Sequence, residues 1–414
     1  MSRQSPIAVT GMGCVSPLGN NSDAAWDAYF HGLSASRKLE EPWASGGDTF
    51  LAAVVDYDIA SLLGEFLVNR LDRCSQFALL AARQAWFASG LGEQEIPGDR
   101  LAVVLGTGIG GQSTLIQQYE RNAAGARRVH PLAVAMAMPN AAAAQVAIEL
   151  GAHGGAHAPV SACASGAEAI VWGQMLLAAD QADVVVVGGA EAAIHLATMR
   201  GFAEMRALSC RHADPAGACR PFAEDRDGFV LGEGAGVLVL ERLRDAEARH
   251  APIEGLLLSA GMTSDAHHLA MPQPDGLHSA EAIRKALRCA DAVPEDLAMI
   301  SAHATGTALG DLAEARALRL VLGAATDQVW VTAPKAGLGH LLGAAGAVES
   351  ILTLKALQRA VVPRSLNADP PDPEIPLRIA SQRNEPLSPR SRHLALKNSF
   401  GFGGHNVSLL WASA

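Results

Sequence analysis

The sequence predicts an α/β protein in which strands and helices alternate in layers. Short apolar runs rich in valine, leucine and isoleucine, which are typical of buried strands, alternate with longer segments rich in alanine and leucine, which are typical of helices. No long Pro/Ser linker or low-complexity segment divides the chain, and the proline-rich stretch at 363–376 is short enough for a surface loop. Alternation of this kind favours a layered α/β fold.

Each expected element follows from a local run of residues. Uninterrupted apolar runs predict strands at 7–10, 101–105, 184–187 and 237–240. Segments rich in alanine and leucine predict helices at 72–90, 141–150, 164–180, 279–290, 311–322 and 343–360.

A faint internal duplication relates the two halves of the chain. In the first half, Pro159-Val-Ser-Ala-Cys leads into a small-residue helix; in the second, Thr332-Ala-Pro-Lys leads into another, from about Gly343. A glycine turn precedes an apolar strand near the end of each half, at 232–240 and 401–410. Two copies of one layered unit, spanning 1–250 and 251–414, would explain this pattern.

Composition limits the classes of function. The 414 residues include 32 Lys and Arg against 42 Asp and Glu, which gives a net charge of −10 and argues against a general nucleic-acid binder. Hydrophobic residues make up 49% and charged residues 18%, as expected of a core-forming chain. Aromatic residues make up only 5%, so the core must be packed with alanine, leucine, valine and the 41 glycines.

The chain is expected to be cytoplasmic and reduced. No apolar run reaches the roughly 18 residues of a membrane span, and the first residues contain no apolar stretch of signal-peptide length. The six cysteines are scattered and include no CxxC pair, so we expect neither a disulfide framework nor a zinc site.

Cys163 is the first candidate for chemistry. It lies in Val160-Ser-Ala-Cys-Ala-Ser-Gly, where an extended segment meets a helix of small residues. A helix N-terminus carries free N–H groups and a positive partial charge, which stabilise a thiolate. Small neighbours leave room for a substrate. A buried structural cysteine is the alternative.

Two further motifs carry titratable groups. Ser301-Ala-His303-Ala-Thr305-Gly-Thr307 follows an apolar run and precedes a helix, so it places a histidine and two hydroxyls at a strand end. The segment 334–349 contains Lys335, His340 and Glu349 among almost only small and apolar residues. Burying such groups unpaired would be costly, so they are expected to form a polar network.

Two glycine-rich segments are less specific. Asn398-Ser-Phe-Gly-Phe-Gly-Gly-His-Asn allows a turn that can aim N–H groups at an oxyanion, although an ordinary hairpin explains it too. Gly106-Thr-Gly-Ile-Gly-Gly matches G-x-G-x-x-G after a strand. No strand ending in an acidic residue follows about 20 positions later, as dinucleotide binding would need.

Taken together, these motifs resemble the β-ketoacyl-acyl carrier protein synthases, of the KAS II type and of type II polyketide ketosynthases. The resemblance covers essentially the whole chain, from Thr10-Gly-Met-Gly-Cys-Val-Ser-Pro-Leu-Gly to Asn398-Ser-Phe-Gly-Phe-Gly-Gly, and includes Arg226-Asp-Gly-Phe-Val-Leu-Gly-Glu-Gly-Ala and Gly339-His-Leu-Leu-Gly-Ala-Ala-Gly-Ala. It implies the thiolase-like fold, a duplicated α-β-α-β-α unit with mixed five-stranded sheets.

The resemblance also implies catalytic roles. Cys163 would hold the growing acyl chain, and the backbone N–H groups of Cys163 and Phe400 would form the oxyanion hole. His303 and His340 would bind the thioester carbonyl of malonyl-acyl carrier protein and stabilise the enolate that decarboxylation forms. Lys335 would orient His303.

Supporting residues follow from the same resemblance. Glu349 would be the buried partner of Lys335, while Asp311 and Glu314 would support this network. Thr305 and Thr307 could hold the pantetheine arm of the substrate. No cofactor or metal is implied, because decarboxylation drives the condensation and the substrates are carried on phosphopantetheine.

The acyl pocket is expected to reach the partner subunit. By resemblance, Ile109 and Phe400 are gates, and the segment from Pro131 lines the far end near the dimer interface. Ala133 and Ala135 would lie on one face of an extended segment and leave space for long or rigid chains.

The implied partners are an acyl carrier protein and a second ketosynthase-type chain, either identical or a chain-length-factor-like paralogue. Acyl carrier proteins are acidic, so arginines near the pocket mouth would steer them. The candidates for this carrier-protein patch are Arg70, Arg73, Arg127, Arg128, Arg206 and Arg211.

Each of three alternative functions predicts one sequence feature that this chain does not match. A thiolase would need a second cysteine in the turn at 398–406, which contains none. A non-catalytic chain-length-type subunit would lack the nucleophile that Cys163 supplies. A dinucleotide-binding protein would need the acidic strand end that is missing after the glycine motif.

Overall fold

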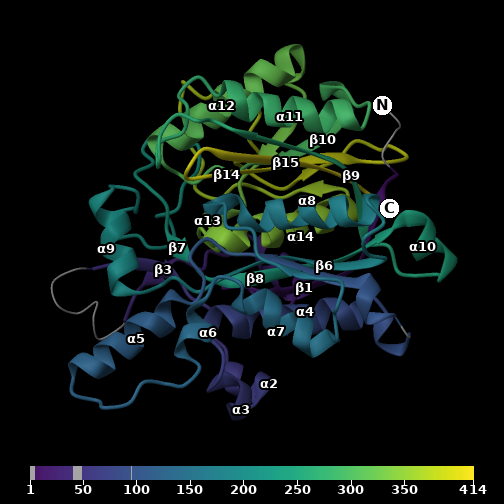
Figure 1. Ribbon diagram of the computed structural model, residues 1–414. Coiled ribbons are helices and arrows are strands. Elements are labelled where there is room, and N and C mark those ends of the chain that lie inside the picture. The colour runs from purple at the N-terminus through teal and green to yellow at the C-terminus, as the bar shows by residue number, and fades with distance from the viewer. Residues whose placement is uncertain (1–4, 41–48, 95) are drawn as a thin grey trace.

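The computed structural model describes residues 5–40, 49–94 and 96–414, which fold into five layers, α-β-α-β-α (Figure 1). Two outer helical layers cover the outside, and two helices are buried between the sheet layers, where α14 contacts strands of both halves. The layered fold predicted from the sequence is confirmed. The principal helices are α4 (Arg73–Ala88) and α7 (Ala141–Leu150) on one outside, α11 (Leu277–Cys289) and α12 (Ala308–Leu322) on the other, and α8 (Ser165–Ala178) and α14 (Ala345–Gln358) in the middle.

Among the described residues, ten strands form one mixed sheet, in the order β11-β10-β14-β15-β9-β1-β8-β6-β4-β5. The two expected five-stranded sets are joined edge to edge in this sheet. Strands β9 and β1 pair antiparallel through residues 255–257 and 7–9, because each would otherwise be an open edge. The strands are β1 (Ile7–Val15), β4 (Leu101–Gly106), β5 (Ala156–His157), β6 (Val184–Glu191), β8 (Gly234–Arg242), β9 (Gly255–Ser264), β10 (Leu297–Ser301), β11 (Trp330–Thr332), β14 (Leu394–Gly401) and β15 (His405–Ala412).

The duplication is visible in the direction of pairing. From one outer edge inward, β5, β4 and β6 are parallel, and β8 and β1 follow antiparallel. From the other edge, β11, β10 and β14 are parallel, and β15 and β9 follow antiparallel. The chain passes from the first set of strands to the second between residues 242 and 255.

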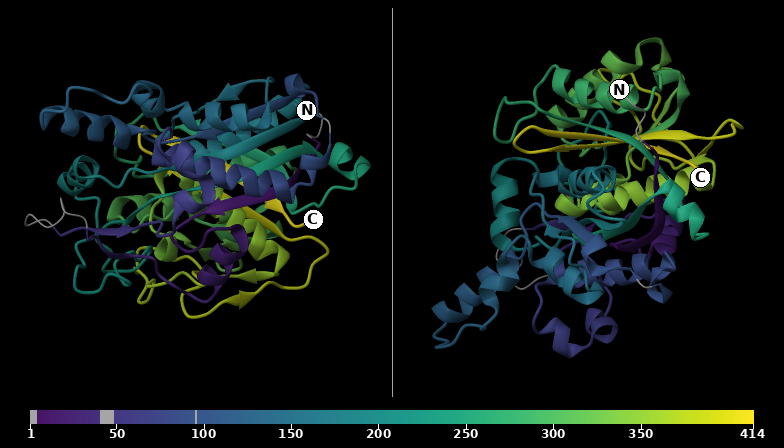
Figure 2. Two further views of the ribbon diagram at one scale, coloured as in Figure 1. Left: turned by 90° about the horizontal axis from the view of Figure 1, so that it is seen from below. Right: turned by 45° about the vertical axis from the view of Figure 1, so that its right-hand side comes forward.

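The remaining elements surround this framework. No helix in the described residues is both long and apolar enough to cross a membrane. Helix α5 and the loop after it project from the body of the molecule (Figure 2). These elements are α1 (Ser22–Phe30), α2 (Ile59–Leu63), α3 (Glu65–Val68), α5 (Gln112–Ala123), α6 (Ala133–Ala137), α9 (Leu196–Glu204), α10 (Leu243–Ala248), α13 (Lys335–Leu338), β2 (Arg37–Lys38), β3 (Leu51–Ala53), β7 (Leu231–Gly232), β12 (Val361–Val362) and β13 (Glu385–Pro386).

One local prediction is wrong. The segment that contains Ala133 and Ala135 is not extended but forms the short helix α6. Its Ala-Val-Ala-Met-Ala sequence alternates like a strand, yet alanine and methionine are strong helix formers. Two residues apart on a helix point about 200° from each other, so these alanines do not share a face.

The first turns of α8 and α14 meet at the centre of the molecule. A Cβ at Gly166 would lie 2.7 Å from the carbonyl oxygen of Gly343 and 3.1 Å from the nitrogen of Ala347. A Cβ at Gly346 would lie 2.5 Å from the nitrogen of Ala167. Both helices therefore need glycine here.

Gly346→Ala is expected to destabilise the protein by about 1–3 kcal/mol, because the new methyl group meets backbone that cannot move aside. The matched control is Gly201→Ala in α9, whose added Cβ has nothing within 4 Å. Alanine is the better helix former, so this control should be neutral or slightly stabilising. Equal melting temperatures for the two variants would contradict the packing argument.

Candidate active site

Cys163 lies in the 3₁₀ turn η4 (Ala162–Ala164), directly before α8. Ala162 adopts a left-handed conformation with φ of 51°, which turns the chain into the helix. The Ser165 hydroxyl accepts a bond from the Ser161 N–H (2.9 Å) and contacts the carbonyl oxygen of Ala162 (2.7 Å), so the turn is clamped. The predicted position at a helix start is confirmed.

His340 lies beside the thiol. Its Nε2 is 3.0 Å from the Sγ of Cys163, and its Nδ1 accepts the backbone N–H of Leu342 at 3.3 Å. Because Nδ1 is an acceptor, the neutral ring carries its proton on Nε2. His340 is therefore a donor toward the reacting atoms and not a base that removes the thiol proton.

His303 is held in the same tautomer by Lys335. The Lys335 Nζ lies 3.4 Å from the His303 Nδ1, and an ammonium can only donate there. The His303 and His340 rings are 5.5 Å apart between centroids. Two neutral rings thus carry Nε2–H donors in one place, as a developing enolate oxygen requires.

Buried carboxylates hold the loops of the second half. Glu349 contacts the Lys335 Nζ at 2.6 Å. Glu314 accepts the backbone N–H groups of His303 (2.9 Å) and Ala304 (2.7 Å). Asp311 accepts those of Gly306 (3.0 Å) and Phe222 (2.8 Å). The structure therefore brings together the cluster predicted from the sequence.

Burial governs the titration of the site. Burial and then the Lys335 charge hold the pKa of both His303 and His340 well below the usual range, so both rings are neutral at neutral pH. Burial also raises the pKa of Cys163 to about 12, although the Lys335 charge and a backbone N–H of Phe402 oppose it. The stabilisation of a thiolate that the helix start predicts is thus smaller than the cost of burying the sulfur.

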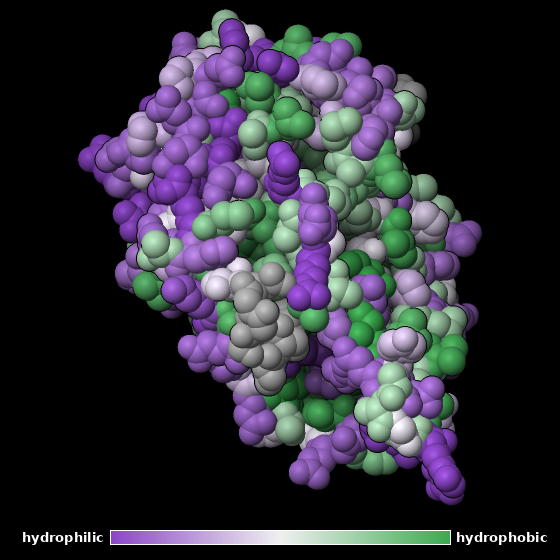
Figure 3. All heavy atoms as spheres, turned by 90° about the vertical axis from the view of Figure 1, so that its left-hand side faces the viewer, coloured by the Kyte–Doolittle hydropathy of each residue, from purple (hydrophilic) through white to green (hydrophobic). Residues whose placement is uncertain are grey.

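A cavity of about 610 Å³ opens onto these groups. Both predicted gates, Ile109 and Phe400, line it, as do Thr305 and Thr307, whose hydroxyl oxygens are 2.9 Å apart. Ala133 and Ala135 are not among its lining residues in the single chain. Figure 3 shows the side of the molecule on which α5 and α9 lie, with apolar side chains among the polar ones.

Glu191 is a site residue that the sequence reasoning missed. It ends β6 completely buried, and it accepts the N–H groups of Gly108, Ile109 and Gly110 and that of Gly343. Burial raises the pKa of this carboxyl, and the four N–H groups oppose the shift. A protein carboxylate thus fills the nest of the G-x-G-x-x-G motif, which explains why the motif is not a phosphate cradle. In the sequence, Glu191 was visible as an acidic residue at the end of an apolar strand, and this position could have predicted a buried carboxylate.

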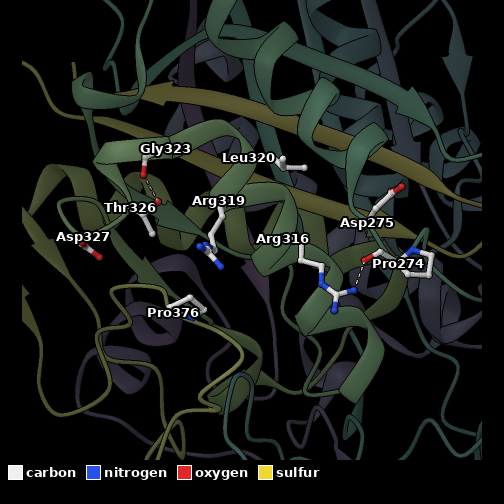
Figure 4. Close-up of a pocket in the computed structure, with 9 residues that line it drawn as sticks. All are labelled: Pro274, Asp275, Arg316, Arg319, Leu320, Gly323, Thr326, Asp327 and Pro376. Carbon is white, nitrogen blue, oxygen red and sulfur yellow. Dashed lines mark hydrogen bonds between the residues drawn. The ribbon is translucent and has the colours of Figure 1, made fainter.

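A second hollow lies away from the thiol, beside α12 (Figure 4). It is lined by Arg316, Arg319 and seven other residues, and none of these lines the Cys163 cavity. The Arg316 guanidinium donates to the carbonyl oxygen of Pro274 at 2.8 Å. The lining of this second hollow contains neither a cysteine nor a histidine. The cysteine and the two histidines described above line the first cavity.

The comparisons with known proteins agree with this geometry. The beta-ketoacyl synthase N-terminal domain matches residues 4–246, and the C-terminal domain matches residues 255–369. The 3-oxoacyl-[acyl-carrier-protein] synthase 2 of Mycobacterium bovis is 40% identical over 97% of this chain and 96% of its own. That of Staphylococcus aureus is 37% identical over 99% of each chain.

Solved structures show the same fold. A beta-ketoacyl synthase from Burkholderia phymatum has a TM-score of 0.90 at 29% identity. A type II polyketide ketosynthase, solved in complex with its acyl-carrier protein and bound to the hexaketide, has a TM-score of 0.90 at 27% identity. The ishigamide ketosynthase/chain length factor has a TM-score of 0.90 at 28% identity. Each alignment covers 99% of this chain and 100% of the other.

The chain therefore belongs to the beta-ketoacyl synthase family, with the thiolase-like fold that the sequence motifs implied. Within that family it is an acyltransferase of the 3-oxoacyl-carrier protein synthase class.

The Lys335 charge favours the Cys163 thiolate, so Lys335→Met should raise the pKa of the thiol and slow its alkylation. One pKa unit corresponds to about a tenfold change in thiolate fraction well below the pKa. Peptide mass spectrometry after iodoacetamide treatment at several pH values measures the rate. The exposed Cys289 in the same molecule is the internal control and should react equally in both proteins. An unchanged ratio of Cys163 to Cys289 labelling would contradict the role of Lys335.

Proposed function

We propose that the chain condenses an acyl group held on Cys163 with malonyl-acyl carrier protein, releasing CO₂ and a 3-oxoacyl product on the carrier. One observation carries this proposal: the Nε2 of His340 lies 3.0 Å from the Cys163 sulfur, beside a second histidine held in the same donor tautomer. A nucleophile and two neutral donors in one cavity suit a reaction with a covalent acyl stage and an enolate stage.

The first stage loads the acyl chain. The Cys163 sulfur bonds to the thioester carbonyl carbon, the carbon–sulfur bond to the carrier breaks, and the Cys163 proton goes to the leaving carrier thiolate. The backbone N–H groups of Cys163 and Phe402 both bond to the Cys163 sulfur. We therefore assign the oxyanion of the tetrahedral intermediate to these two donors, with Phe402 in place of the expected Phe400. The His340 donor and the Lys335 charge ease loss of the proton, which burial otherwise disfavours.

The second stage forms the carbon–carbon bond. The Nε2–H groups of His303 and His340 bind the malonyl thioester oxygen, and loss of CO₂ leaves the enolate. Its α-carbon attacks the acyl carbon on Cys163, and the thiolate leaves and regains a proton. Thr305 and Thr307, which line the cavity, are placed to bind the pantetheine arm.

The alternatives fit the residues less well. A thiolase needs a second cysteine in the turn at 398–406, and this segment contains none. A non-catalytic chain-length subunit needs no nucleophile, whereas Cys163 here contacts His340 inside an open cavity. Elongation in fatty-acid or type II polyketide or polyene synthesis, in the cytoplasm, is the setting that we propose.

One arginine of the proposed carrier-protein patch, Arg206, lines the cavity. Arg127 and Arg128 follow α5, and Arg206 follows α9 and lines the cavity; α5 and α9 lie on the same side of the molecule (Figure 1). These side chains are exposed, as is Arg70. Arg73 is bound to Glu233 at 2.6 Å and Arg211 to Asp225 at 2.5 Å, so both contribute less charge to a partner.

A second chain is proposed to cover the edge strand β5. His157 of this strand lies beside Trp172 of α8, with ring centroids 6.1 Å apart. Trp172 and Met175 are exposed one turn apart, whereas the pseudo-equivalent helix α14 is buried along nearly its whole length. β5 pairs with β4 on one side and ends the sheet on the other. An apolar face beside such a sheet edge suits another ketosynthase-type chain, identical or a chain-length-factor-like paralogue. The ishigamide ketosynthase/chain length factor has this fold. The acyl tunnel proposed at Ala133 and Ala135 would lie near that interface.

Cys163→Ala is expected to abolish both condensation and acyl loading. His303→Ala and His340→Ala should lose malonyl decarboxylation by about 100-fold or more, because each removes a donor to the enolate, and should lose self-acylation less. Self-acylation is measured by protein mass after incubation with an acyl-carrier thioester, and decarboxylation by CO₂ release. Acylation of another cysteine, with Cys163 unmodified, would refute the proposed function. Equal loss of both half-reactions would refute the division of roles.

Charge reversal at Arg127 and Arg128 is expected to raise the KM for carrier-bound substrate about tenfold at low salt, with a smaller effect at high salt. A small acyl-pantetheine substrate should show no change. Arg244→Glu is the matched control, because Arg244 is exposed on α10, a helix that lies on the opposite side of Figure 1 from α5 and α9. An unchanged KM for the carrier substrate at low salt would dispose of the patch.

A further inference from the structure

Lys397 is a buried cation to which neither the sequence motifs nor the proposed mechanism gives a role. The chain has only five lysines, all within the described residues, and Lys335 and Lys397 are both completely buried. Lys397 lies on β14, directly before the glycine turn that carries Phe400. Its position in an otherwise apolar strand was visible in the sequence, but its partner was not.

The two lysines share one carboxylate. Glu349 of α14 places Oε1 2.6 Å from the Lys335 Nζ and Oε2 2.8 Å from the Lys397 Nζ. The Lys397 Nζ also donates to the Ser399 Oγ (3.1 Å) and to the carbonyl oxygen of Asn398. Burial lowers the pKa of Lys397, and the charge of Glu349 opposes this shift. The ion-pair distance to Glu349 and the two oxygens that accept from the Nζ favour the charged ammonium form.

Among the described residues, Glu349 is the carboxylate that makes an ion pair with both lysines. Glu314 accepts backbone N–H groups and the Asn398 amide, and its charge also reaches Lys335 and Lys397, while Asp311 faces Arg226 at 3.7 Å. Burial favours the neutral forms of the other titratable groups nearby, which are Tyr29, Cys163, Cys219, Glu191, His303 and His340.

We propose that Lys397 is a positioning residue for the decarboxylation stage, acting through Glu349 on Lys335 and the two histidines. By engaging one oxygen of Glu349, it leaves part of the Lys335 charge directed at the Nδ1 of His303. That charge keeps His303 unprotonated at Nδ1, so the ring stays in the tautomer that donates from Nε2. The inference rests on the proposed condensing function.

A neutral His303 matters for the chemistry. A doubly protonated ring would lose the Lys335 contact, because both nitrogens would then be donors. It would also attract the malonyl carboxylate and stabilise the ground state that must lose CO₂. The direction of titration agrees: burial lowers the pKa of His303 most, and the charges of Lys335, His340 and Lys397 lower it further.

The sign of the effect follows. Without Lys397, Glu349 would neutralise Lys335 more fully, and the pKa of His303 would rise. The acid limb of the decarboxylation profile is the pH range in which the rate falls as His303 becomes protonated. This limb would therefore move to higher pH, by about half a unit or more. The plateau rate should also fall about three- to tenfold, because less positive charge faces the enolate.

The test compares Lys397→Met with Lys397→Arg. The pH profile of CO₂ release from malonyl-acyl carrier protein, without acyl primer, gives the acid limb, and mass spectrometry gives self-acylation at Cys163. Lys397→Met should shift the limb and lower the plateau, and it should slow self-acylation less, because the Lys335 charge also acts on the Cys163 thiol. Lys397→Arg should restore the limb. Lys355→Met is the matched control, because Lys355 is on the same helix as Glu349 but pairs with Asp23.

Stability separates this role from a structural one. Lys397→Met leaves Glu349 and Lys335 as a balanced pair and replaces a buried charge by an apolar chain, so its melting temperature should hold or rise. A fall in melting temperature with an unmoved acid limb would overturn the proposal. If the Met variant does not fold, Lys397→Gln takes its place, and an unmoved limb there would overturn it equally. A wild-type protein that releases no CO₂ would instead refute the proposed function.

Discussion

The active site depends on how closely α8 and α14 meet. Their first turns touch through Gly166 and Gly346, and a Cβ at Gly343 would lie 2.3 Å from the nitrogen of Gly108. Only residues without side chains allow this approach, and it places the turn of Cys163 against the turn that follows His340. Glycine at 166, 343 and 346 is therefore a requirement of the site as well as of the core.

Buried carboxylates position the loops around this contact. Glu191 holds the loop at 108–110 and Glu314 holds the backbone of His303, each through bonds from main-chain N–H groups. Strand pairing cannot supply these bonds, because each loop begins where its strand ends. A carboxylate satisfies several donors at once, and it fixes a loop without filling the space that a substrate needs.

Much of the architecture could be predicted from local sequence. Apolar runs such as 184–187 located strands, and the small-residue segment after Cys163 located a buried helix. The alternation at 131–139 failed because alanine and methionine fit a helix as readily as the pattern fits a strand. The pairing of β1 with β9 and the meeting of Glu349 with Lys397 join residues far apart in the chain, and no local pattern encodes such contacts.

Ala162 and Leu342 both adopt the left-handed conformation, with φ of 51° and 45°, and each is the first residue of a 3₁₀ turn that leads into a buried helix. The residue after Ala162 is Cys163, and the residue after Leu342 is Gly343. The fold thus contains two equivalent helix entrances, one with a nucleophile and one with no side chain. Condensation joins two unlike partners, one bound covalently and one not, and a symmetric pair of sites could not tell them apart. At this position the two halves differ in the way that such a reaction needs, because one presents a thiol and the other presents no side chain.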